Sequence, residues 1–162
     1  MTRLRSDVEG ANAVEFALVL PVLVLLLFGT MYGGSLFNSQ QTVTQAAREG
    51  ARFGATAPLS AFADQAEWEQ TIENRARGIL DVDRPLTPGA VEVCVRFYDV
   101  DDSQTNNGSS ACPDPTPAGD LQGARVEVTT TRDARLELGI ASIGPITLRS
   151  TATARYEPDD LE

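Results

Sequence analysis

The sequence predicts an α+β protein with a long N-terminal transmembrane and stalk helix, a second amphipathic helix and a small antiparallel β-sheet of three or four strands. Three observations lead to this prediction. An uncharged apolar run extends from residue 16 to residue 37, and apolar residues recur at three- and four-residue steps between residues 60 and 80. Apolar and polar residues then alternate in three later segments, 90–98, 124–131 and 146–156, as in half-buried strands.

The apolar run from Phe16 to Phe37 is long enough to cross a membrane. At about 1.5 Å of rise per residue, its roughly 22 positions reach about 33 Å, the thickness of a hydrocarbon core. A buried core helix is the alternative, but a chain of 162 residues rarely needs one that is apolar on every side. We therefore expect one membrane-spanning helix, in which Gly29, Gly33 and Gly34 form a candidate packing seam.

Glu15 is the single charged residue between Gly10 and Ala47. An isolated carboxylate in hydrocarbon costs about 2.5 to 3.5 kcal/mol, so Glu15 needs either a shallow position among head groups or a partner. A partner arises if the chain is cut after Gly10, because the new ammonium on Ala11 then lies one helical turn from a Glu15 carboxylate of the same or a neighbouring subunit. Both interpretations stay open on the residues alone.

The ten residues before this segment are polar. They contain Arg3 and Arg5 but no apolar stretch of their own, so they do not form an ordinary secretory signal. Charge does not fix the orientation of the helix, because Arg3 and Arg5 on one side face Arg48 and Arg52 on the other.

The helix is expected to continue from Asn38 to about Phe53 as a stalk and to end before Pro58. One thin apolar stripe is expected to pack on the globular domain. A charged group on the same stretch is most simply a solvated face, with a structural role as the alternative. The stripe consists of Val43, Ala47 and Gly50 or Ala51, and the charged group of Arg48, Glu49 and Arg52.

A second helix is predicted from about Ser60 to Leu80, followed by a loop from Asp81 to Gly89. The apolar face of this helix is expected to cover a sheet, with Trp68 as a core residue. The residues at helical spacing are Phe62, Ala66, Trp68 or Glu69, Ile72, Ala76, Ile79 and Leu80.

The first strand is predicted at 90–98, and a long polar segment, 99–122, is expected to be irregular. Val91, Val93, Val95 and Phe97 are expected on one face of this strand, with Glu92, Cys94, Arg96 and Tyr98 on the other. A second strand at 124–131 is expected to place Ala124, Val126, Val128 and Thr130 on one face.

The next segment, 133–143, is compatible with either a short helix or a bent strand. Gly144 and Pro145 are expected to turn the chain into a last strand, and the acidic tail 157–162 is expected to fray. The inward row of the last strand is expected to be Ile146, Leu148, Ser150, Ala152, Ala154 and Tyr156.

The composition of the chain argues against most kinds of catalytic and metal-binding site. A net charge of -10 argues against a nucleic-acid surface, and the absence of histidine removes Ser-His-Asp triads, Cys-His pairs and His-ligated zinc. Acidic and amide residues between Asp99 and Asn107 are closely spaced, as calcium ligands are in a binding loop. The spacing does not match the EF-hand pattern, because Gln104 occupies the position of its conserved glycine. We expect no enzyme, no catalytic residue, no metal and no cofactor. A hydrolase that uses carboxylates alone is the weakest alternative.

Two sequence blocks carry a family resemblance. Ala13–Pro21 follows a short charged leader that ends at Gly10, and Ala46–Arg52 reads Ala-Ala-Arg-Glu-Gly-Ala-Arg. At this spacing the blocks resemble the TadE-like proteins of the tight-adherence (Tad/Flp, type IVb) pilus system, with a weaker similarity in the closing strand 146–157. The resemblance hardly reaches residues 56–123.

The resemblance implies three regions: a cytoplasmic prepilin-type leader (1–10), a transmembrane and stalk helix (11–55) and an extracytoplasmic globular domain (56–162). The chain would be a single-pass protein of the bacterial inner membrane. It would serve as a minor pilin or pseudopilin in pilus assembly and cell adhesion. The alternative from the residues is a membrane-anchored extracytoplasmic binding or sensing module.

The resemblance also implies a processing site and partners. A prepilin peptidase would cut between Gly10 and Ala11, which puts Glu15 and Phe16 at mature positions five and six as an assembly contact. The implied partners are the prepilin peptidase, other Tad pilins, the inner-membrane assembly platform and the lipid bilayer, with no nucleic acid.

The two cysteines, Cys94 and Cys112, are expected to form a disulfide. An even pair in a domain that lies outside the reducing cytosol favours oxidation. Two buried free thiols are the alternative.

Overall fold

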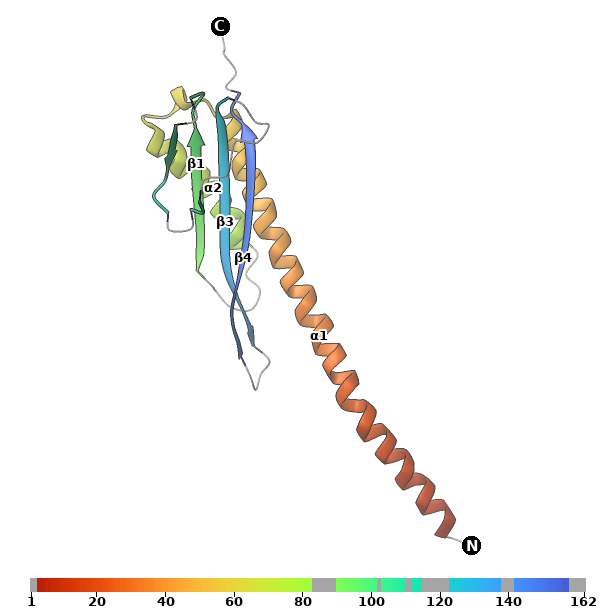
Figure 1. The fold of residues 1–162 in the computed structure, drawn as a ribbon. Coiled ribbons are helices and arrows are strands. Elements are labelled where there is room, and N and C mark those ends of the chain that lie inside the picture. The colour runs from red at the N-terminus through yellow and green to blue at the C-terminus, as the bar shows by residue number, and fades with distance from the viewer. Residues whose placement is uncertain are drawn as a thin grey trace. The chain divides into compact units, whose positions relative to one another are not determined.

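The computed structural model describes residues 3–82, 90–101, 103–109, 112–114, 123–137 and 142–157. It confirms the α+β prediction (Figure 1). The elements are α1 (Arg3–Thr56), the short 3-10 helix η1 (Leu59–Ala61), α2 (Gln65–Val82), β1 (Val91–Tyr98), β2 (Gln104–Asn106), β3 (Arg125–Glu137) and β4 (Ser142–Arg155). The chain forms two compact units, residues 1–37 and 38–162.

The first unit is helical, and from Asn12 onward α1 is long and apolar enough to cross a membrane. Its large apolar side chains are exposed, as expected of a surface that faces lipid. Pro21 lies inside the helix without ending it. A membrane helix tolerates proline because neighbouring groups satisfy the freed carbonyl.

The second unit contains an antiparallel sheet with the strand order β2-β1-β3-β4. β1 and β3 are the central strands and pair along the whole of β1, from Val91 opposite Arg132 to Tyr98 opposite Arg125. β2 lies within the polar segment that was expected to be irregular, and no hydrophobic alternation marks it. It pairs with the end of β1, where Thr105 lies opposite Phe97.

Both helical segments of this unit, α2 and residues 38–56 of α1, lie behind the sheet in Figure 1. The predicted stripe of α1 is confirmed, because its residues are 0 to 2 % exposed and Gly50 lies against Val128 of β3. Thr130 of β3 donates a hydrogen bond of 2.8 Å to the Val43 carbonyl. The core consists of Val43, Ala46, Ala47 and Ala51 of α1; Trp68, Ile72, Ala76 and Leu80 of α2; Val93, Val95 and Phe97 of β1; and Val126 and Val128 of β3.

The start of α2 corrects the sequence prediction. The helix begins at Gln65 rather than near Ser60, because Asp64 caps it: Asp64 Oδ1 accepts a hydrogen bond of 2.8 Å from the Glu67 N–H. Glu67 reaches back and accepts a hydrogen bond of 2.7 Å from the Ala63 N–H, so both carboxylates hold the backbone at the start of the helix. Phe62 therefore precedes the helix, and Ala66 is exposed on its first turn.

The expectation that β1 is buried on one side only is wrong. Cys94, Arg96 and Tyr98 point away from the helices and yet are 1 to 3 % exposed. The segment that contains Cys112 and Pro113 covers this face, and the Pro113 carbonyl accepts a hydrogen bond of 2.6 Å from Arg96.

The predicted turn at Gly144 and Pro145 is also wrong, because both residues lie inside β4. The ambiguous segment that precedes them is strand as far as Glu137. The pairing changes register between Ala134 and Leu136, where β4 contains one more residue than β3. Proline fits here because it has no N–H to donate and lies at a bulge on an edge strand. The predicted inward row is confirmed from Ile146 to Tyr156, since these side chains are less exposed than their neighbours.

The outer edge of β4 lies beside α1. Gln40 Nε2 donates a hydrogen bond of 3.3 Å to the Arg149 carbonyl, and the Glu157 N–H donates one of 3.2 Å to the Ala55 carbonyl. A helix beside an edge strand limits pairing with another chain. The predicted loop and tail fall mainly on 83–89 and 158–162, which lie outside the described residues.

Candidate functional site

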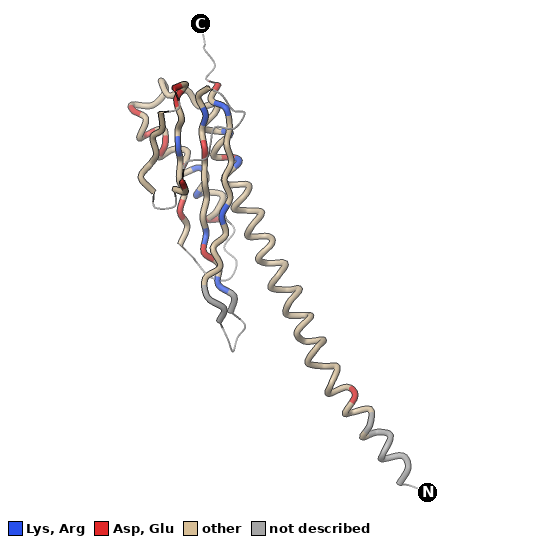
Figure 2. Tube along the Cα trace, viewed as in Figure 1, with Lys and Arg blue, Asp and Glu red and all other residues tan. Residues whose placement is uncertain are grey.

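The predicted processing and assembly residues all lie in α1. In the part of the first unit whose side chains the structure describes, Glu15 is the one charged residue. The corresponding helix in Figure 2 is tan except for a red acidic position near its grey end. Gly10 and Glu15 are exposed, and the Phe16 side chain is 67 % exposed. No described atom lies within 4 Å of a Cβ added to Gly10. No described side chain therefore covers position 10.

The peptide bond between Gly10 and Ala11 lies four residues before Glu15 on a continuous helix, about 6 Å along the axis. Residues at this spacing share a helix face. An ammonium at Ala11 and a carboxylate at Glu15 are therefore close enough to pair within one chain.

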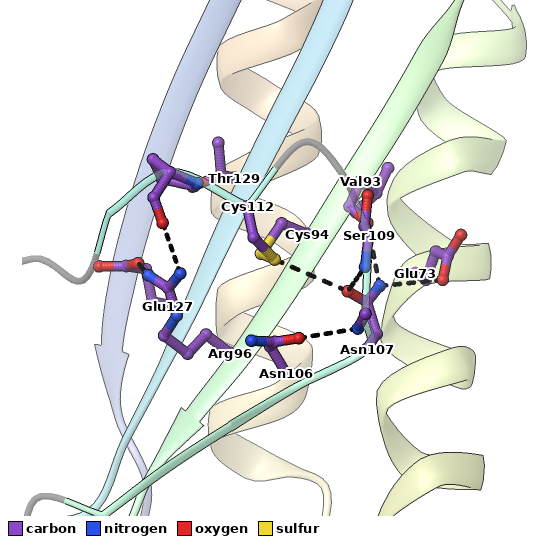
Figure 3. The surroundings of a disulfide bond; sticks show 12 residues. Glu73, Val93, Cys94, Arg96, Asn106, Asn107, Ser109, Cys112, Glu127 and Thr129 are labelled. Carbon is purple, nitrogen blue, oxygen red and sulfur yellow. Dashed lines mark hydrogen bonds and ion pairs between the residues drawn. A yellow bond between two sulfur atoms is a disulfide. The ribbon is translucent and has the colours of Figure 1, made fainter.

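A disulfide joins Cys94 of β1 to Cys112, with their Cα atoms 4.9 Å apart, as the sequence predicted (Figure 3). Asn107 anchors the chain between them. Its Nδ2 donates hydrogen bonds to Val93 O at 2.9 Å and to Glu73 Oε2 at 3.0 Å, and its N–H bonds to Val95 O at 3.1 Å. Gly108 then turns the chain at a φ of 69°, which favours glycine. The covering segment is thus tied to β1 at several points.

A buried ion pair lies beside the disulfide. Arg96 Nη1 donates a hydrogen bond of 2.8 Å to Glu127 Oε1, and these side chains are 4 % and 2 % exposed. Arg96 also bonds to the Pro113 carbonyl and, at 3.4 Å, to the Tyr98 hydroxyl. These contacts hold the covering segment on the sheet.

Three of the loop residues considered as calcium ligands accept hydrogen bonds from nearby backbone N–H groups. Asp99 Oδ1 accepts a hydrogen bond from the Val100 N–H, and Asp101 Oδ1 accepts one from the Ser103 N–H. Asn106 Oδ1 accepts one from the Gly108 N–H. Among the described residues, no three carboxylate, cysteine or histidine side chains gather as metal ligands do.

A groove of about 760 Å³ lies on the second unit between α1 and α2. We call it the arginine groove. It is lined by Gln45, Arg48, Glu49 and Arg52 of α1 and by Asn74, Arg75, Gly78 and Ile79 of α2.

Glu49 joins the two walls of the arginine groove. Its carboxylate pairs with Arg75 across the groove at 3.1 Å and with Arg52 on its own helix at 3.2 Å. The Arg75 hydrogen bond, aided by the charges of both arginines, lowers the pKa of Glu49 below its ordinary value despite partial desolvation. Arg75 also lies over the Phe53 ring, 5.2 Å from its centroid. Glu49 therefore has the structural role that was considered as the alternative, whereas Arg48 and Arg52 are exposed, as in a solvated face.

Sequence reasoning missed the contribution of α2 to the arginine groove. Arg75 lies 26 residues beyond Glu49, and no local pattern pairs them. The one available signal was Gly78, a glycine inside a predicted helix.

The family model for TadE-like proteins matches residues 10–52, which confirms the predicted resemblance over that segment. No curated protein and no solved structure gives a significant match. The matched segment begins at Gly10, contains Glu15 and Phe16, and ends at Arg52 on the wall of the arginine groove.

Proposed function

We propose, from the TadE-like sequence of residues 10–52, that this chain is a minor pilin-like subunit of a tight-adherence pilus. A prepilin peptidase cuts it between Gly10 and Ala11, and the mature helix then enters the assembly. Its role is structural rather than catalytic. Before assembly the helix anchors the protein in the inner membrane, with the second unit outside the cytoplasm.

Glu15 is the observation that carries the proposal. It is an exposed carboxylate near the start of the apolar stretch of α1, which has no other charged residue between Gly10 and Ala47, and it lies five positions after the residue where the family match begins. In lipid such a group costs free energy, and pairing with the ammonium of Ala11 on an adjacent subunit relieves that cost. The charge thus favours the assembled state over the isolated membrane protein.

The processing step is tested by N-terminal sequencing of the full-length chain expressed with an active prepilin peptidase. The expected mature N-terminus is Ala11. Gly10→Arg should leave the leader attached, because a long charged side chain obstructs approach to the peptide bond. A start at Met1 or Thr2 in the parent protein, with the peptidase shown to cut a known substrate in the same cells, contradicts the proposal.

The assembly step is tested with Glu15→Ala. This variant should be cut like the parent but should be absent from sheared fibres, whereas Thr30→Ala, a polar change in the same apolar helix, should enter them. If Glu15→Ala enters fibres as well as the parent, the carboxylate has no assembly role. A plain membrane-anchored binding or sensing module then becomes the better interpretation.

A further inference from the structure

The arginine groove has more positive charge than its own residues neutralise. Its walls present Arg48, Arg52 and Arg75 but only one carboxylate, that of Glu49, which gives a local charge of +2 from three arginines and one glutamate. Arg52 and Arg75 share Glu49. The side chain of Arg48 is exposed, and within the described part of the chain no residue forms a hydrogen bond or ion pair with it. This concave basic surface belongs to a chain whose net charge is -10.

Gly78 supplies a second, independent observation. It lies inside α2, where glycine disfavours the helix relative to alanine. Other glycines of this unit have a packing reason: a Cβ on Gly50 would stand 3.1 Å from Val128, and one on Gly54 would stand 2.7 Å from Ile72. At Gly78 no described atom lies within 4 Å of an added Cβ. The space that Gly78 leaves therefore opens into the groove, where it allows the backbone of another molecule to come close.

We propose that the arginine groove binds an acidic helical segment of a partner protein. Arg48 and Arg52 lie one helical turn apart, and Arg75 faces them from the second wall. A partner helix with carboxylates one turn apart matches this spacing, and a guanidinium binds a carboxylate through paired N–H donors. A groove between two packed helices commonly binds a third helix.

The charge pattern favours a partner of this kind over a further copy of the same exposed helix surface. Two copies of the groove would oppose arginine to arginine. Ile79 offers an apolar contact to the bound helix, and the open position at Gly78 leaves room for its backbone. Small residues and the aliphatic parts of glutamate side chains on the partner helix fit such a surface. The inference goes beyond the proposed function and does not depend on the cut at Gly10.

The test uses the full-length chain in nanodiscs of phosphatidylcholine, a lipid without net charge. The probe is a fluorescein-labelled, alanine-rich helical peptide with glutamate at every fourth position, and the matched control peptide has glutamine at the same positions. Fluorescence anisotropy measures binding. The glutamate peptide should bind about tenfold more tightly or better, since charge-assisted hydrogen bonds to the guanidinium groups are lost with glutamine. Its affinity should fall as salt rises.

Three variants locate the binding. Arg48→Gln combined with Arg52→Gln should weaken the glutamate peptide by about tenfold or more. Gly78→Leu should block it while favouring the helix, so that a loss of binding cannot come from unfolding. Arg149→Gln combined with Arg155→Gln removes two exposed arginines from β4 and should leave binding unchanged. The emission of Trp68, the single tryptophan, reports whether each variant is folded.

Several outcomes overturn the proposal. Equal affinity for both peptides would show that the carboxylates do not contribute to binding. An equal loss of affinity in the β4 control would show that exposed arginines in general, rather than those of the groove, attract the peptide. Unchanged binding to Gly78→Leu would place the peptide elsewhere. If added phosphatidylglycerol removes peptide binding from the parent protein and the double variant of Arg48 and Arg52 loses its affinity for that lipid, the groove holds a lipid phosphate instead.

Discussion

Gly54 of α1 lies directly against Ile72 of α2: a Cβ atom added to Gly54 would stand 2.7 Å from Ile72 Cδ1. The same atom would stand 2.9 Å from Val126 Cγ1 of β3. Real Cβ atoms do not approach so closely, so one of these elements would have to move. The end of Ile72 can rotate, but Val126 is β-branched and buried and has little freedom. The closest approach of α1, α2 and the sheet therefore depends on glycine at this position.

Gly54→Ala should destabilise the second unit by about 1 to 3 kcal/mol, because overpacking forces a shift of buried neighbours. The matched control is Gly78→Ala on α2, which meets no described atom and should stabilise by up to about 1 kcal/mol through helix propensity. Urea unfolding followed by Trp68 fluorescence measures both. Equal effects of the two substitutions would show that the close contact at Gly54 relaxes without cost.

The disulfide should contribute about 3 kcal/mol to the stability of the second unit, the value that the chain-entropy model gives for a separation of 18 residues. The double variant Cys94→Ala and Cys112→Ala should therefore unfold at lower urea. Mass spectrometry without reduction, on protein from the native envelope, should show that two hydrogens are missing. Free thiols in that sample would contradict both the pairing and an oxidising location.

Regular periodicity made much of this fold predictable. Val43 and Ala47 recur at a helical step that faces the sheet, and both are fully buried. Ile72 and Leu80 do the same on α2. Burial by a single neighbouring surface leaves such a pattern in the sequence, because each turn must present the same side.

Features that depend on local capping or distant contacts were not predicted. The start of α2 is set by Asp64 and Glu67, whose spacing is a cap signal that periodicity does not register. Gly144 and Pro145 suggest a turn, but pairing with β3 holds them in a strand. Nothing in the sequence of β1 itself predicts that its second face is buried, because a segment from beyond residue 106 covers that face.

Some residues of the candidate site could be predicted from the sequence and others could not. Gly10 and Glu15 could be singled out from the sequence because their signal is local: a polar leader, then one acid in an apolar run. The arginine groove could not, because Glu49 and Arg75 meet only after α1 and α2 have packed.

Glu69 should make stability depend on pH. Burial raises the pKa of Glu69 above its ordinary value, although hydrogen bonds from Gln65 and Thr105 oppose this. The folded state therefore holds the proton more tightly than the unfolded state does. Stability should fall as pH rises from about the ordinary value of 4.5 through the raised pKa.

Glu69→Gln keeps an oxygen acceptor for both partners and removes the charge. It should have little effect at acidic pH, where Glu69 is protonated in both states, and should stabilise the protein increasingly as pH rises. Urea midpoints across this pH range measure the difference. Glu157→Gln, at an exposed position, is the control. Parallel pH profiles for the parent and Glu69→Gln would show that burial of Glu69 has no energetic consequence.

The last prediction concerns the buried pair of Arg96 and Glu127. Glu127→Leu leaves the guanidinium of Arg96 buried without its carboxylate and should cost about 3 to 5 kcal/mol. The double variant Arg96→Met and Glu127→Leu removes both charges, so it should recover most of that loss. The recovery should be incomplete, because Arg96 also bonds to the Pro113 carbonyl at 2.6 Å and that acceptor loses its partner. A double-mutant cycle in urea gives the coupling energy; if the double variant is no more stable than Glu127→Leu, the pair does not act as a unit and the Pro113 contact accounts for the stability.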